Sequence, residues 1–179
     1  MKQAARIVLA LLLLASAAWA GKRDPLTDAE ADKLREARLE PGKRLKLFIE
    51  FTEARLDKID SVRSDPKEAT GRGQKVHDLL EDFSALIDEI DDNLDMYQSE
   101  HLDKDQLKEY KKGLRELTSA ENRFSARLRS LQHDADSDAQ AKAEAHEYSF
   151  ALQDAMDGLK ASMETLKEYS AEKQEEKPK

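Results

Sequence analysis

The 179-residue sequence contains no cysteine, only six glycines and four prolines, and a single tryptophan. Without cysteine the chain can form neither a disulfide nor a thiolate metal site, and it cannot attach haem covalently, which requires a Cys-x-x-Cys-His motif. Its stability must therefore come from burial of side chains. The scarcity of glycine and proline, combined with 38% charged residues, is typical of long helices.

The first twenty residues have the order of a secretory signal. Lys2 and Arg6 precede an apolar run that begins at Ile7, and small residues close the segment at Ala18-Trp19-Ala20. The apolar stretch is about fourteen residues, whereas a bilayer span needs roughly twenty. We therefore expect residues 1–20 to be a cleaved signal peptide and the remainder to be periplasmic or secreted; an uncleaved N-terminal membrane helix is the alternative.

The charge balance excludes two classes of partner. Thirty Lys and Arg stand against 38 Asp and Glu, a net charge of −8, and loss of Lys2 and Arg6 with the signal makes it about −10. A chain this acidic is repelled by nucleic acid and by anionic lipid. We expect no nucleic-acid partner and no stable membrane span after cleavage.

Five helices are expected along the mature chain. Thr27 and Glu30 form a capping-box pattern that predicts a short helix from Asp28 to about Leu39, which Pro41-Gly42 would end. Apolar side chains at alternating spacings of four and three predict long helices over 43–64, 74–98, 105–133 and from Ser137 to about 170. Residues 171–179 form a charged tail.

The predicted fold is all-α. Short links favour an elongated up-down antiparallel four-helix bundle with coiled-coil-like packing over residues 43–170, with the short helix of residues 21–42 laid against it. A long helical hairpin that dimerises to complete its core is the rival arrangement. The sequence does not separate the two.

No catalytic, cofactor or metal constellation is recognisable. The sequence has no glycine-rich phosphate loop, nucleophile elbow or zinc-protease helix, and no histidine carries the Glu-x-x-His spacing of di-iron bundles. His77 and Glu81 share a helical face, but zinc sites normally need three or four converging ligands. We expect no enzyme, no cofactor and no metal; a ligand- or metal-binding bundle remains as an alternative.

Glu121 is the one charged residue on the apolar face of the helix over 105–133. Burial would raise its pKa or require a basic partner. One hypothesis pairs Glu121 with an arginine of a neighbouring helix, so that the pair fixes the register. The alternative is a stem along the core with the carboxylate in water.

Two surfaces are candidates for partner contact. Leu47 and Phe51 lie away from the main apolar face of their helix, so either the first helix covers them through Ala31, Leu34 and Ala37, or they form an exposed patch for a partner or a second copy. An acidic stripe on the helix over 74–98 is either a solvated face, screened by basic residues of the next helix, or a docking strip for a basic partner. The stripe comprises Asp88, Asp91, Asp92 and Asp95.

Two short segments resemble a known family. Leu26-Thr27-Asp28-Ala29-Glu30, followed by Lys33-Leu34-Arg35, is similar to the first motif of the periplasmic LTxxQ proteins, and Leu117-Thr118-Ser119-Ala120-Glu121 is a second partial match; both have Glu where the family has Gln. The resemblance implies a helical cradle that holds unfolded clients or senses envelope stress. The favoured function is that of a non-enzymatic exported protein that acts through protein–protein contact or self-association. The resemblance provides the alternative, a helical chaperone or stress protein.

Overall fold

The computed structural model describes residues 24–98, 102–137 and 139–175, and within these ranges the chain is all-helical. The expected signal peptide lies outside the described residues. No helix in the described part is both long and apolar enough to cross a membrane. The elements are α2 (Asp28–Glu36), α3 (Pro41–Ser64), the 3-10 turn η2 (Pro66–Glu68), α4 (Arg72–Gln98), α5 (Lys104–Ala135), α6 (Ala139–Ala145) and α7 (Ser149–Glu175).

Local capping chemistry sets several helix ends. The Thr27 hydroxyl accepts from the Glu30 backbone N–H, and the Glu30 carboxylate accepts from the Thr27 backbone N–H, so the predicted capping box is present. Asp103 and Gln106 form a second capping box at the start of α5. Pro41 does not end α2, which finishes at Glu36; it is the first residue of α3, where its missing N–H costs nothing.

The fifth expected helix is broken in two. The chain turns over residues 146–148, between α6 and α7. Neither glycine nor proline lies there, so no local signal predicts the break. Tertiary packing accounts for it: Tyr148 is 3% exposed, and the Glu147 side chain occupies the space that a Cβ on Gly73 would need.

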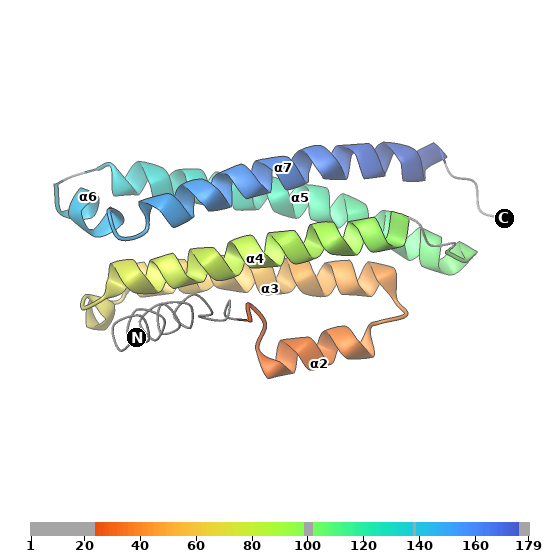
Figure 1. The fold of residues 1–179 in the computed structure, drawn as a ribbon, viewed down its shortest axis with the longest axis horizontal. Helices are drawn as coiled ribbons and strands as arrows, with labels where there is room; N and C mark the ends of the chain where they lie inside the picture. Colours follow the sequence, from red (N-terminus) through yellow and green to blue (C-terminus); the bar gives the residue numbers. More distant parts are fainter. Residues whose placement is uncertain (1–23, 99–101, 138, 176–179) are drawn as a thin grey trace, which may run out of the picture.

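The four long helices lie side by side, each against two others: α3 packs on α4 and α5, and α7 packs on α4 and α5 (Figure 1). Residue pairing gives their directions. Glu53 and Arg63 of α3 pair with Arg123 and Asp134 of α5, so both helices run the same way. Asp91 and Asp95 of α4 contact Ser162 and Tyr169 of α7, so these two are parallel as well.

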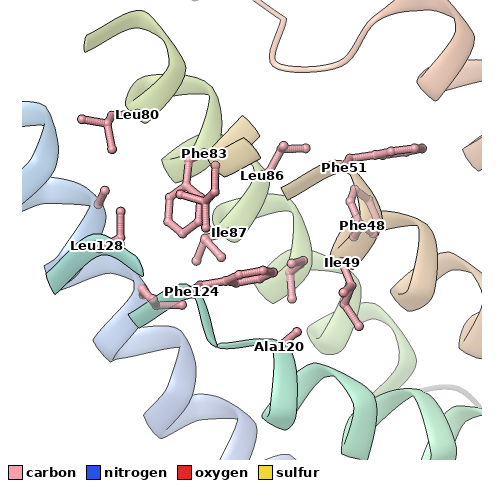
Figure 2. Close-up of a cluster of buried hydrophobic side chains, with 14 of the residues drawn as sticks. Phe48, Ile49, Phe51, Leu80, Phe83, Leu86, Ile87, Ala120, Phe124 and Leu128 are labelled. Carbon is pink, nitrogen blue, oxygen red and sulfur yellow. The ribbon is translucent and has the colours of Figure 1, made fainter. Parts of the chain in front are cut away.

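Helices α4 and α5 follow one another in the sequence, with only residues 99–103 between them, but their backbones do not pack against each other. This differs from the expectation that every short link joins adjacent helices. The two helices lie across the diagonal of the core and meet through long side chains: the rings of Phe83 and Phe124 make an edge-to-face contact at 5.9 Å, with Phe48 of α3 in the same buried cluster (Figure 2).

Helices α3 and α5 approach each other closely at two glycines. A Cβ on Gly42 would lie 2.6 Å from the backbone oxygen of Glu109, and one on Gly113 would lie 3.4 Å from the Gly42 Cα. The crossing therefore requires glycine at position 42, because any side chain there collides with backbone rather than with a movable side chain.

Candidate functional site

The first candidate site is the face of α3 that α2 covers. The Arg55 guanidinium of α3 forms a two-pronged ion pair with Glu30 of α2, with nitrogen–oxygen distances of 2.8 and 2.7 Å. Its Nη2 also donates to the Pro25 carbonyl at 2.6 Å, and its Nε lies 3.9 Å from an Asp82 oxygen of α4. We call Arg55, Glu30 and the Pro25 carbonyl the clasp; it ties the N-terminal segment to two long helices.

Glu30 has two tasks in this arrangement. Its carboxylate closes the capping box with Thr27 and also receives Arg55. The Arg55 hydrogen bond, aided by those from Thr27, lowers the pKa of Glu30 from 4.5 to about 2, against the opposing effect of burial. The clasp is therefore fully charged at neutral pH.

Helix α2 lies on the face of α3 that carries Leu47 and Phe51. Phe51 is only 4% exposed, Leu47 is half-buried, and Leu34 and Ala37 are buried between the helices. The Lys33 ammonium sits 5.9 Å from the centre of the Phe51 ring. In this conformation the two residues form no open patch, because the first helix occupies the place where a partner would lie.

The second candidate site is a polar cluster in the interior. Glu121 of α5 is 1% exposed, and the Ser162 hydroxyl of α7 lies 3.1 Å from its Oε1. The same hydroxyl lies 2.6 Å from Oδ1 of Asp91 on α4. The hydrogen-bonding partner of Glu121 is thus a serine shared with a second acid, and the predicted arginine partner is wrong.

Hydrogen counting constrains the protonation of this acid–serine–acid cluster. A serine hydroxyl has one hydrogen to donate, so it cannot donate to both carboxylates at once. If Ser162 donates to Asp91, the contact with Glu121 is a hydrogen bond only when Glu121 carries a proton and donates it. Burial first, and then the nearby Asp91 charge, raise the pKa of Glu121 to about 7 against the lowering effect of Ser162.

The acidic stripe is divided between surface and interior. Asp88, Asp92 and Asp95 are exposed, whereas Asp91 is half-buried against α7. The Tyr169 hydroxyl of α7 donates to Asp95. Burial and the three neighbouring aspartates raise the pKa of Asp91, and the Ser162 hydrogen bond lowers it. Part of the stripe is therefore a contact between α4 and α7.

Sequence reasoning missed one polar residue that the fold places inside, because nothing marked Asn93, which is 4% exposed, as a core residue. Ser162 and Tyr110 follow the apolar spacing of their helices, but nothing marked their hydroxyls as polar groups of the core. The Tyr110 hydroxyl is buried without a hydrogen-bond partner, and burial raises its pKa. Asn93 lies seven residues after the buried Leu86, and this spacing was the available signal for a second buried stripe on α4.

His77, Asp78 and Glu81 bring one potential metal ligand each to within 4.8 Å of one another. All three belong to one turn of α4, and their side chains are 29%, 40% and 67% exposed. Such a set resembles the solvated face expected from the sequence more than a closed zinc site, which needs ligands from several directions.

No protein-family model matches the chain, and comparisons with curated proteins and with solved structures found no match. The two LTxxQ-like segments also occupy unlike environments. Thr27 caps α2, whereas Thr118 lies within α5 and its hydroxyl donates to the Leu114 carbonyl. The argument for function therefore starts from the geometry of the clasp and of the buried cluster.

Proposed function

We propose that this chain is an exported, non-catalytic helical protein that acts through protein–protein contact, and that its contact surface is the α3 face around Leu47 and Phe51. In this proposal the four long helices form a self-contained bundle, and α2 is a removable cover. The observation that carries it is the clasp: a nine-residue helix is held over an apolar face by the charged hub Arg55, together with an Arg44 hydrogen bond to the Leu34 carbonyl.

The cover is weakly attached compared with the core. Within α2 only Leu34 is buried, and Ala37 follows at the C-cap. Helices this short are not stable alone in water, so α2 depends on its docking. Release would cost those few contacts, the clasp, and the hydrogen bonds that Arg44, Tyr97 and Gln106 donate to the carbonyls of residues 34, 38 and 39. It would expose the Phe51 ring and the buried side of Leu47 and leave the Phe83–Phe124 core intact.

The chemistry of the covered face defines its partner. A ligand that replaces α2 needs a carboxylate for Arg55 and, one turn later on the same face, a leucine-sized side chain. Glu30 and Leu34 provide this pair in α2 at spacing i, i+4. The expected partner is therefore an amphipathic helix with a Glu-x-x-x-Leu face, bound in the helix-in-groove manner.

The test is a full-chain variant, Glu30→Lys, which reverses the charge that Arg55 holds. Asp32→Lys makes the same charge change beside it, at a residue whose ion pair with Arg35 is exposed. The probe is a labelled synthetic peptide of residues 24–40. We expect saturable binding to the Glu30→Lys chain, measured by fluorescence anisotropy, and at least about tenfold weaker binding to the wild type and to Asp32→Lys, a difference of about 1.4 kcal/mol.

The peptide supplies its own control. A version with Glu30→Lys and Leu34→Asp lacks both recognition groups and should not bind. If the unaltered peptide fails to bind the Glu30→Lys chain, or binds all three chains equally, the α3 face is not the contact surface.

A further inference from the structure

We propose that Glu121, Ser162 and Asp91 form a proton-dependent lock, which holds the C-terminal half of α7 against α4 and α5 while Glu121 is protonated and loosens it when Glu121 ionises. The inference is independent of the α3 face, because none of the three residues lies on α2 or α3. It assigns a regulatory role to Glu121, which among the described residues is the only buried acid and has no basic partner.

Side chains from three helices, α4, α5 and α7, meet at one hydroxyl, that of Ser162. The Ser162 hydroxyl, in a side chain that is 0% exposed, lies 3.1 Å from Oε1 of Glu121 and 2.6 Å from Oδ1 of Asp91. With Glu121 protonated, the chain Glu121–Ser162–Asp91 has one hydrogen for each contact. With Glu121 ionised, a buried and a half-buried carboxylate face one hydroxyl, and one contact loses its hydrogen.

The surroundings offer little to neutralise a second charge. On α4, three further acids, Asp88, Asp92 and Asp95, add negative charge around Asp91, which belongs to the cluster. From α3, the buried Thr52 donates its hydroxyl to the Phe48 carbonyl, and Glu53 is paired with Arg123 at the surface.

On α7 the charged neighbours of Ser162 are Lys160 and Glu164, both exposed. Among the described residues that are buried, none is Lys, Arg or His. The positive charges nearest along α7 therefore stay in solvent, where water screens them from the cluster.

Proton linkage fixes the direction of the effect. The pKa of Glu121 rises from 4.5 to about 7 on folding, so between these values the folded chain keeps a proton that the unfolded chain has lost. The contribution of Glu121 to the free energy of unfolding is therefore fully present below pH 4.5 and is lost as the pH rises to about 7. Over this interval the unfolding equilibrium constant should increase by about two orders of magnitude, at up to about tenfold per pH unit.

The experiment compares the full chain with Glu121→Gln, whose amide has the shape of the protonated acid and does not titrate. Glu164→Gln, at an exposed position of α7, is the matched control. Urea unfolding at half-unit steps from pH 5 to 8 gives the equilibrium constant. Hydrogen exchange over residues 159–171, corrected for intrinsic rates, gives the opening of α7.

The lock predicts that wild type and Glu164→Gln lose stability as the pH rises, and that exchange in α7 accelerates by at least about tenfold from pH 5 to 8, about 1.4 kcal/mol. Glu121→Gln should lack both trends. The lock is overturned if Glu121→Gln keeps the wild-type slope, or if α7 exchange is independent of pH while stability changes. Repeating the wild-type series with EDTA covers a bound cation: loss of stability at pH 8 on chelation would mean that a metal, not a proton, occupies the cluster.

Discussion

The two parallel helix pairs, α3–α5 and α4–α7, are held by opposite kinds of polar contact. Along α3–α5 the contacts join unlike charges: Arg127 binds Asp57 and Asp60 at 2.7 and 2.5 Å, and Arg63 binds Asp134 at 3.0 Å. Along α4–α7 they join acids to hydroxyls, Asp91 to Ser162 and Asp95 to Tyr169. One pair balances charge across its interface, and the other concentrates negative charge within it.

Position explains why the two pairs should behave differently. The aspartates that bind Arg127 are 69% and 62% exposed, so water weakens their attraction to Arg127, and removing the ion pairs should cost little. Glu121, which faces the α4–α7 contact, is 1% exposed. The α3–α5 contacts should therefore respond weakly to pH near neutrality, whereas the α4–α7 contacts carry the pH response of the molecule.

The largest expected effect concerns the backbone contact of α3 with α5. Gly42→Ala places a Cβ 2.6 Å from the Glu109 carbonyl oxygen, so the helices must separate, and we expect the free energy of unfolding to fall by about 2–3 kcal/mol. Gly158→Ala on α7 is the matched control, because its Cβ would meet nothing within 4 Å. It should raise the free energy of unfolding by about 0.5–1 kcal/mol. Urea unfolding measures both; equal effects of the two substitutions would contradict the close crossing.

The clasp provides an ion pair with the pH response opposite to that of Glu121. Arg55→Ala should lower the stability of α2 docking by about 1–2 kcal/mol at pH 7, seen as faster proteolysis within residues 24–40, with Arg35→Ala as the exposed control. The pKa of Glu30 is lowered to about 2, so in wild type this stabilisation is present above pH 4.5 and is lost as the pH falls from 4.5 to 2. Docking that persists unchanged at pH 2 would refute the clasp.

A smaller effect is expected from the exposed ion pairs of α3–α5. Arg127→Ala should cost about 0.5–1 kcal/mol, and raising the salt concentration to 1 M should reduce this difference. The slope of stability against pH between 5 and 8 should match that of the wild type, because Glu121 is untouched. A changed slope would mean that the two helix pairs do not respond separately.

The smallest effect is expected at another buried oxygen. The Tyr110 hydroxyl lacks a hydrogen-bond partner, and its ring lies 5.7 Å from that of Tyr97. Tyr110→Phe removes the unpaired hydroxyl and keeps the ring contact, so the free energy of unfolding should stay the same or rise by up to about 1 kcal/mol. A fall in the free energy of unfolding by more than about 1 kcal/mol, measured by thermal unfolding, would show that the hydroxyl is hydrogen-bonded in solution.

The apolar rhythm of the sequence was sufficient for the long helices, apart from the break at residues 146–148, and for one buried stripe on each. On α4 the apolar positions at alternating spacings of four and three are all buried: Val76, Leu80, Phe83, Ile87, Ile90, Leu94 and Tyr97. The same rhythm marked Glu121 as unusual, but its partner was misassigned, because Glu121 and Ser162 meet across 41 residues of sequence. Asp91, the second acid of the cluster, lies off the predicted stripe. Helix α4 packs on both α3 and α7, so it buries a wider face than a single heptad stripe, including Leu86 and Asn93.

Features set by distant contacts were beyond prediction from one sequence. The turn at 146–148 has no glycine or proline. It depends on the burial of Tyr148 and on the packing of the Glu147 side chain against Gly73 of α4. The diagonal placement of α4 and α5 depends on which side of the core the chain crosses after residue 98, and link length alone leaves that choice open. The clasp likewise required Arg55 and Glu30 to meet across 25 residues.

The central claim is that folded Glu121 keeps its proton at pH values between 4.5 and about 7, where the unfolded chain has lost it. Carbon-13 NMR of the glutamate side-chain carboxyls, with the Glu121 signal assigned by its absence in Glu121→Gln, measures this directly. The account predicts a titration midpoint near 7 for this signal. A midpoint between 4 and 5 would show an ionised acid at neutral pH and would contradict the account.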